Sequence, residues 1–142
     1  MKNFYLLFLV CLFSGITYAQ EKVANIEFTT QEIDYGTIAK GSNGIRTFEF
    51  TNTGEAPLVI TNVYSSCGCT IPKKPEEPIA PGKTGVIEVK YNTTRVGPIS
   101  KTITVHSNAK NAPTIALRIK GTVDDKKEES VLMKKTSVMD KK

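Results

Sequence analysis

Ile115-Ala116-Leu117-Arg118-Ile119-Lys120 places a large aliphatic residue at every second position and a small or charged residue between them. The same period of two recurs in Ile87-Glu88-Val89-Lys90-Tyr91 and in Thr102-Ile103-Thr104-Val105-His106. Successive side chains of a β-strand point to opposite sides, so this period predicts strands with one apolar face and one exposed face. Such a face is stable only when a second layer covers it, which predicts two packed sheets.

About seven such strands follow one another in roughly one hundred residues, with turn signals between them, as a two-sheet sandwich requires. No helical periodicity precedes the charged tail, so the sequence predicts one all-β domain over residues 24–123. The expected core residues are the inward members of the alternating pairs: Phe48, Phe50, Leu58, Ile60, Ile87, Val89, Ile103, Val105, Ile115, Leu117 and Ile119.

The segment from Ile71 to Gly85 differs from its neighbours because it carries four prolines: Pro72, Pro75, Pro78 and Pro81. Each proline removes a backbone N–H that a sheet needs, so the segment is expected to be a loop or an edge strand. Pro81-Gly82 predicts a type II turn, and Asn52-Thr53-Gly54-Glu55 predicts another turn.

The first nineteen residues have the pattern of a secretory signal peptide. Lys2 precedes the uncharged apolar run Phe4–Phe13, and Thr17-Tyr18-Ala19 offers the small residues that signal peptidase reads. The run is too short to span a bilayer, and Cys11 lies inside it, so no membrane or lipid anchor is expected. Cleavage after Ala19 predicts an exported protein, periplasmic or secreted, of 142 − 19 = 123 residues, and the loss of one Lys lowers the net charge from +5 to +4.

The other end of the chain, residues 124–142, is rich in Lys and acidic residues and has no aromatic residue. A weak amphipathic helix over Glu128–Met139 would be marginal without a burial partner. We therefore expect a charged, disordered tail, with tethering to a partner as the alternative.

Composition disfavours several classes of function. The positive charge is scattered rather than gathered in a stripe with aromatic residues, so nucleic-acid binding is not expected. His106 is the only histidine and no nucleophile-elbow motif is present, which disfavours a hydrolase. Gly82-Lys83-Thr84 is not a phosphate loop, because Glu77 stands where the leading Gly belongs. We therefore expect a protein that is not an enzyme and that binds no cofactor.

Once the signal is removed, Ser66-Cys67-Gly68-Cys69-Thr70 holds every remaining cysteine. An oxidising compartment favours a disulfide between Cys67 and Cys69. A ring of three residues contributes only about 1.6 kcal/mol in the loop-entropy formula, and strain in so tight a ring can offset it, so the bond should be easily reduced. Gly68 is expected to allow the ring through backbone angles that are closed to other residues.

Two alternatives stay open for this cysteine pair. The first is a pair of free thiols packed as small hydrophobic groups, and the second is capture of a soft metal such as Cu(I). Zinc is less favoured because a structural site needs four ligands and His106 is the only obvious third.

Several stretches form a series along the chain: Asp34-Tyr35-Gly36-Thr37-Ile38, Phe48-Glu49-Phe50-Thr51-Asn52-Thr53-Gly54, Pro57-Leu58-Val59-Ile60, the Cys-Gly-Cys stretch, Tyr91-Asn92-Thr93, Val105-His106-Ser107-Asn108 and Ile119-Lys120-Gly121. The series resembles the bacterial domain-of-unknown-function 1573 family over about residues 33–123. The resemblance implies an immunoglobulin-like sandwich, similar to Hydin-type and major-sperm-protein-like domains, in an exported protein of a kind seen chiefly in Bacteroidetes. The family has no established activity, so the resemblance implies a fold but no reaction.

These observations predict a binding or scaffolding module of the cell envelope that contacts an envelope protein partner. Such sandwiches bind through end loops or through a sheet edge that accepts an added strand. The expected contact surface is the Cys-Gly-Cys corner with the proline-rich segment, namely Ser66, Gly68, Thr70, Pro72, Pro75 and Pro78. The rival hypothesis is a thiol-redox or copper-handling protein that acts through Cys67 and Cys69.

Overall fold

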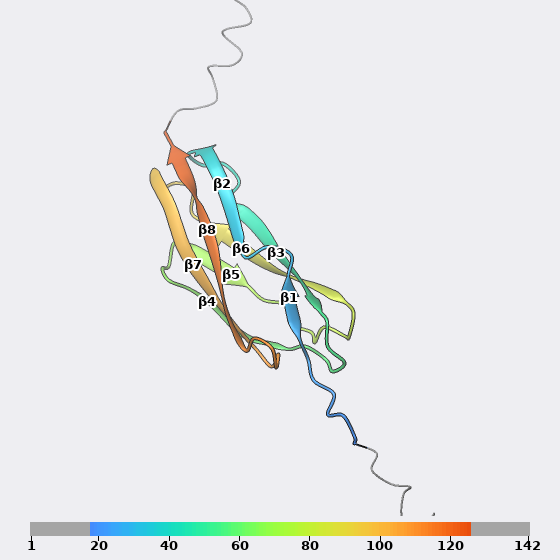
Figure 1. Cartoon of the computed structure of the whole chain (residues 1–142). Helices are drawn as coiled ribbons and strands as arrows, with labels where there is room; N and C mark the ends of the chain where they lie inside the picture. The colour runs from blue at the N-terminus through green and yellow to red at the C-terminus, as the bar shows by residue number, and fades with distance from the viewer. Residues whose placement is uncertain (1–17, 126–142) are drawn as a thin grey trace, which may run out of the picture.

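The computed structural model describes residues 18–125, and within them the chain forms eight strands and no helix (Figure 1). None of these residues forms a helix long and apolar enough to cross a membrane. The predicted signal peptide and charged tail fall almost wholly outside this range. The strands are β1 (Ile26–Phe28), β2 (Glu32–Ala39), β3 (Ile45–Asn52), β4 (Ile60–Ser65), β5 (Thr70–Lys73), β6 (Thr84–Tyr91), β7 (Gly97–Ser107) and β8 (Thr114–Asp124).

The strands form two four-stranded sheets, in the orders β1-β3-β6-β5 and β2-β8-β7-β4. All neighbouring strands are antiparallel except β2 and β8, which are parallel. The chain passes from the edge strand β4 of one sheet to the edge strand β5 of the other through the Cys-Gly-Cys stretch. The predicted two-sheet, all-β architecture is confirmed.

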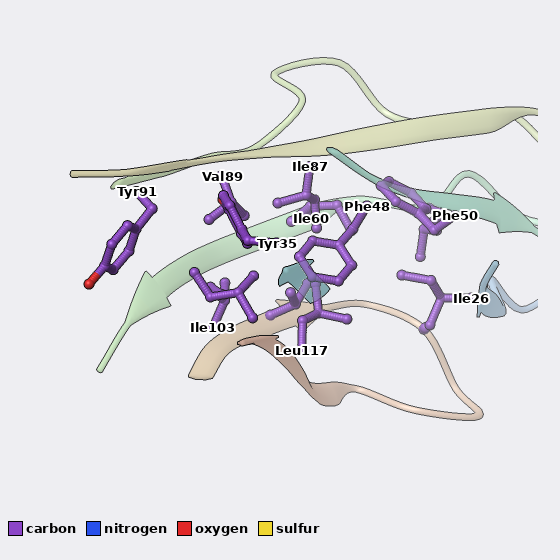
Figure 2. Close-up of a cluster of buried hydrophobic side chains, with 14 of the residues drawn as sticks. Ile26, Tyr35, Phe48, Phe50, Ile60, Ile87, Val89, Tyr91, Ile103 and Leu117 are labelled. Atoms are coloured by element: carbon purple, nitrogen blue, oxygen red, sulfur yellow. The ribbon is translucent and has the colours of Figure 1, made fainter. Parts of the chain in front are cut away.

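The core lies between the sheets, where the labelled side chains of Figure 2 converge. Ten of the eleven expected core residues are buried, and the exception, Ile115, is partly buried and packs against the others. The prediction missed other buried hydrophobic residues of strands and adjoining loops: Ala24, Ile26, Tyr35, Tyr91, Ile99, Ala109 and Val123.

The proline-rich segment contains β5, which the predicted set of about seven strands did not include. β5 lies at a sheet edge, where prolines are tolerated. Leu58, one of the expected core residues, precedes β4 and makes an isolated bridge to Ile79 in the loop after β5. The predicted turn at Pro81-Gly82 is confirmed: Gly82 has φ +75°, and Lys83 N donates to Ala80 O at 3.0 Å.

Asn52, predicted only as a turn residue, is completely buried at the end of β3. Its Nδ2 donates to Ala56 O at 2.8 Å and to Ile79 O at 2.9 Å, and its Oδ1 accepts from Gly54 N at 3.0 Å. A Cβ at Gly54 would collide with the backbone around Val23, which explains why the turn needs glycine there. One carboxamide therefore joins the turn to the proline-rich loop.

Candidate functional site

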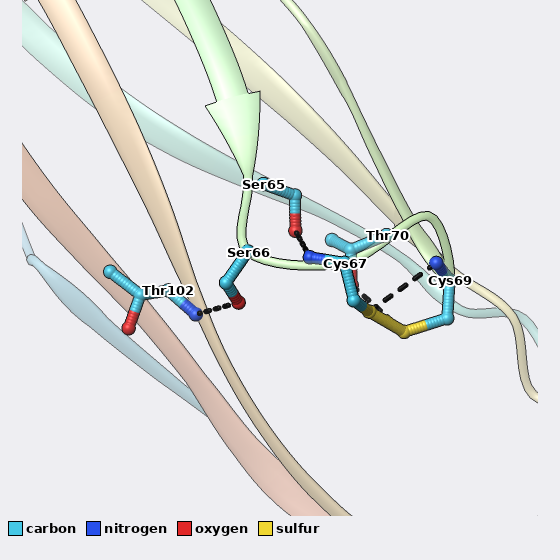
Figure 3. Close-up of a disulfide and its surroundings, with 6 residues drawn as sticks. All are labelled: Ser65, Ser66, Cys67, Cys69, Thr70 and Thr102. Carbon is cyan, nitrogen blue, oxygen red and sulfur yellow. Dashed lines mark hydrogen bonds between the residues drawn. A yellow bond between two sulfur atoms is a disulfide. The ribbon is translucent and has the colours of Figure 1, made fainter.

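Cys67 and Cys69 form a disulfide between β4 and β5, with their Sγ atoms 2.02 Å apart (Figure 3). Cys69 N also donates to Cys67 Sγ at 3.3 Å. The two cysteines thus lie at disulfide distance, as the favoured prediction for the pair requires. The ring sits where the chain changes sheets, and we call it the disulfide corner (residues 66–70).

Backbone hydrogen bonds hold the disulfide corner to both sheets. On the β7 side, Ser66 N donates to Thr102 O at 3.0 Å, and Thr102 N donates to Ser66 Oγ at 3.3 Å (Figure 3). On the β6 side, Asn92 N donates to Cys69 O at 2.9 Å. Strand pairing therefore fixes each end of the corner without help from the sulfur atoms.

The expectation for Gly68 is wrong. Its backbone is not among those with positive φ, and a Cβ added there would meet no atom within 4 Å. The ring closes with ordinary backbone angles because the Cys67 and Cys69 Cα atoms are 5.5 Å apart, within the usual disulfide span.

β5 cannot accept an added strand as an ordinary edge would. The bond from Asn92 N to Cys69 O sets the alternation of the antiparallel ladder, so Thr70 and Pro72 direct their backbone groups away from β6. Thr70 N donates to Cys67 O at 3.4 Å, and Pro72 has no N–H. This edge therefore offers no free donor.

Local side chains also occupy backbone groups on the other three edges. Asn111 binds both Ile26 N and Ile26 O of β1, at 2.9 and 2.8 Å. Thr30 Oγ1 does the same for Glu32 of β2, and Asn62 Oδ1 accepts from Val63 N of β4. Such coverage protects sheet edges against unwanted pairing. With these edge groups occupied, the end loops are the remaining places for a contact surface.

A groove of about 580 Å³ lies beside the disulfide corner. Its lining comes from three separate stretches of chain: Gly41–Ile45 before and at the start of β3, Lys90–Thr94 at the end of β6, and Gly68, Cys69 and Ile71. The sequence prediction missed the first two stretches as site residues, although the turn Lys40–Gly44 and the motif Tyr91-Asn92-Thr93 were both visible in it.

Hydrogen bonds across the groove hold its walls in place. Gly41 N donates to Thr93 O at 3.1 Å, and Thr93 Oγ1 donates to Ser42 O at 2.7 Å. Tyr91 N donates to Gly44 O at 2.9 Å, and a Cβ at Gly44 would collide with the Tyr91 carbonyl. The groove is therefore built before any ligand arrives.

Tyr35 ties the groove wall to the opposite sheet. Its hydroxyl donates to Gly44 O at 2.8 Å, and the Arg46 guanidinium lies 4.4 Å from the centre of its ring. Burial raises the pKa of Tyr35 above its ordinary value of 10.0, and the charge of Arg46 partly opposes this. Tyr35 stays protonated at neutral pH and keeps its donor.

The outer face of the sheet carries an apolar row at the groove. Lys90 of β6 pairs with Ile45 of β3 on one side and with Ile71 of β5 on the other. Ile45 is 38% exposed and Ile71 is 64% exposed, so two large aliphatic side chains flank one lysine. Of the residues that line the groove, only Lys90 carries a charge.

The remaining predicted contact residues do not gather at the groove. Thr70 is buried, so its side chain does not reach the surface. Pro72 lies within β5, and Pro75 and Pro78 follow it in the loop that leads to Ile79, which contacts Asn52 at the other end of the sandwich. None of these prolines lines the groove.

Metal ligands are not assembled in the part of the chain that the structure describes, where no group of three or more His, Cys, Asp or Glu side chains could hold an ion. His106 pairs with Asn62, four residues before Ser66, which places it about 13 Å along the strand from the corner. Its Nδ1 lies 3.0 Å from Thr114 Oγ1, and its ring lies beside Tyr64.

A family model described as a protein of unknown function (DUF1573) matches residues 26–123. The chain belongs to the DUF1573 family. The resemblance found in the sequence motifs is thereby confirmed over the eight strands of this DUF1573 domain. No curated protein matches the sequence.

Solved structures with similar folds come from bacteria and from human. A protein of unknown function from Porphyromonas gingivalis W83 has a TM-score of 0.62 at 18% identity, over 70% of this chain and 46% of that one. The DUF1573 domain thus spans less than half of that protein. The ASH/PapD-like domain 7 of human CEP192 has a TM-score of 0.56 at 11% identity, over 74% and 89% of the two chains.

A third similar structure is the CupB2 chaperone of Pseudomonas aeruginosa, with a TM-score of 0.51 at 9% identity over 77% of this chain and 61% of that one. At these identities the likenesses show the fold alone. The predicted fold class, an immunoglobulin-like β-sandwich, is confirmed by the PapD-like domain.

Proposed function

We propose that this protein is an exported binding module that contacts an envelope protein through the groove and the disulfide corner. The observation that carries the proposal is the apolar row Ile45–Lys90–Ile71, which borders a groove whose walls are already held by hydrogen bonds. Exposed aliphatic residues at a preformed groove are typical of protein contact sites.

The contact is made by side chains rather than by strand addition. β5 is the edge strand among those that line the groove, and its free side lacks donors because of Pro72 and the bond between Thr70 N and Cys67 O. A partner therefore supplies an apolar segment that covers Ile45 and Ile71. An acidic group beside that segment would pair with Lys90.

The test compares capture of envelope proteins by the mature protein and by two surface variants. Ile71→Lys changes the groove border, whereas Val86→Lys changes a residue that is 49% exposed on β6, outside the groove. We expect a partner that Val86→Lys retains and Ile71→Lys loses by at least tenfold, with both variants melting near the parent temperature. Equal capture by the two variants would reject the groove as the contact site.

The rival function is thiol–disulfide exchange, favoured by one observation: Cys69 lines the groove, so a bound thiol could reach the disulfide. In that reaction two thiols of the substrate are oxidised to a disulfide while the Cys67–Cys69 bond is reduced to two thiols. Copper handling would use the same reduced pair as Cu(I) ligands.

The variant Cys67→Ser/Cys69→Ser separates the two functions. A binding module keeps its partner, because the corner is held by backbone bonds on both sides. A redox or copper protein loses dithiol oxidation or Cu(I) binding completely. Retained capture together with no measurable oxidation of a dithiol peptide by the parent protein supports the binding module, and the reverse pattern supports the rival.

A further inference from the structure

The C-terminal end of the described chain lies next to the groove wall. Asp124 O accepts a hydrogen bond from Lys40 N at 2.8 Å, and Asp125 Oδ1 lies 3.6 Å from Lys40 Nζ. The residue after Lys40 is Gly41, the first residue of the groove lining. Figure 1 shows the ends of β2 and β8 side by side at this end of the sandwich. The chain that follows Asp125 therefore starts beside the groove.

The chain that follows Asp125 is long enough for an apolar run to come near the groove. Val131 is six residues beyond Asp125, which allows a span of up to about 20 Å when the chain is extended. Val131-Leu132-Met133 is the longest apolar run in residues 126–142. This reach allows the apolar run to extend to groove residues within about 20 Å of Asp125.

Charge and size also match. Glu128 and Glu129 precede the apolar run, whereas Lys134 and Lys135 follow it. Lys90 is the one charged residue among those that line the groove, so the glutamates on the N-terminal side of the run are the groups that would pair with it. The groove volume of about 580 Å³ falls within the range of sites that enclose small ligands or a few side chains. Ile45 and Ile71 offer the apolar surface that Val131, Leu132 and Met133 would cover.

We infer that Ser130–Met133 docks in the groove of its own molecule and that a partner must displace it. The inference rests on the proposed function, because it assigns a regulator to the same groove. The four connecting residues 126–129 give the segment an effective concentration on the order of millimolar. A contact with a dissociation constant of about 1 mM would then be occupied about half of the time, and apparent partner affinity would fall about twofold.

The experiment uses the full mature chain and two matched tail variants. Leu132→Asp places a charge in the docking run, and Val138→Asp places the same charge outside it. Backbone amide spectra should show shifts at Gly44, Ile45, Ile71 and Asn92 for Leu132→Asp and none there for Val138→Asp. A synthetic peptide of residues 126–142, added to the Leu132→Asp protein, should return these signals toward the parent positions.

Identical groove signals in the parent and in Leu132→Asp would overturn the inference. Shifts that vanish on dilution of the parent would also overturn it, because the occupant would then be the tail of a second copy. The two proposals fail separately. Docking is read from spectra without a partner, whereas the proposed function fails if Ile71→Lys captures as much partner as Val86→Lys. With both correct, Leu132→Asp captures its partner about twofold more tightly than Val138→Asp.

Discussion

Among the described residues, three asparagine side chains bind backbone groups of segments far from them in the sequence. Asn52 does so from the core, Asn111 binds both backbone groups of Ile26, and Asn108 accepts from Val59 N while donating to Pro57 O. A carboxamide can replace a missing strand neighbour because it carries one acceptor and two donors on a short stem. These contacts let irregular loops satisfy backbone groups that the sheets leave unpaired.

Asn52→Ala should lower the free energy of unfolding by about 3 kcal/mol. The change leaves Ala56 O and Gly54 N unpaired and removes one of the two donors to Ile79 O, which keeps its bond from Leu58 N. Each buried group left unpaired costs about 1–3 kcal/mol. Asn62→Ala is the control, since its bond to Val63 N lies at an exposed edge where water can replace it. Urea unfolding measures both variants. A loss below about 1 kcal/mol for Asn52→Ala would show that the contacts are dispensable.

The raised pKa of Tyr35 predicts how the stability of the protein changes at alkaline pH. Its folded pKa lies above the ordinary 10.0, so the folded protein holds this proton more tightly than the unfolded chain does. The stabilisation is complete below pH 10 and is lost as the pH rises through the folded value. Tyr35→Phe should lower Tm at pH 7, because the bond to Gly44 O is lost, and should flatten the fall of Tm above pH 10. Tyr64→Phe, at an exposed site, should keep the parental slope, and an unchanged slope in Tyr35→Phe would refute the assignment.

At the scale of the elements, the period of two located the strands well because each strand has one buried face. It failed where burial does not alternate with polarity. The proline-rich segment was predicted only as a loop or an edge strand, because Pro72 removes a ladder donor, and β5 is such an edge strand. The start of β7 was not predicted, because Gly97-Pro98 resembles a turn. The burial of Asn52 was not predicted because a buried asparagine and a turn asparagine look alike in sequence.

The candidate site could be predicted only in part, for a related reason. The two cysteines lie within one short stretch, so the sequence located the pair, whereas free thiols and soft-metal capture stayed open as alternatives to the disulfide. The groove depends on strand pairing that brings Gly41–Ile45 next to Lys90–Thr94, and no local pattern records that pairing. Ile71 likewise reads as an ordinary loop residue until β5 places it in a row with Ile45.

Phe50→Ala tests the strand register of β3. Phe50 is fully buried, pairs with Gly85 and lies with its ring centre 5.4 Å from that of Phe28. Truncation of such a residue should cost about 3–5 kcal/mol. Val86→Ala, one position along β6 on the exposed face, should cost less than about 1 kcal/mol by the same thermal or urea measurement. Similar losses in the two variants would contradict the register.

At the scale of the whole molecule, the export prediction concerns residues outside those that the structure describes. The natural protein should begin at Gln20, because Thr17-Tyr18-Ala19 precedes it and the apolar run Phe4–Phe13 carries no charge. Intact-mass analysis of protein recovered from its source should give residues 20–142, or the same chain lighter by one ammonia if Gln20 cyclises. A retained Met1 or a lipid adduct would contradict export by this route.

The chain enters the sandwich beside β1 and leaves it at the end of β8, at opposite ends of the long axis (Figure 1). A force applied between the two ends would therefore pull lengthwise. β8 has eleven residues and a neighbouring strand on each side, whereas β1 has three residues and one neighbouring strand. β1 should detach first and release residues 24–31, about 27 Å of chain, while the groove end stays closed. A pulling trace without such a small early step would place the weak point elsewhere. Under load the domain would therefore yield first at the end that lies opposite the groove.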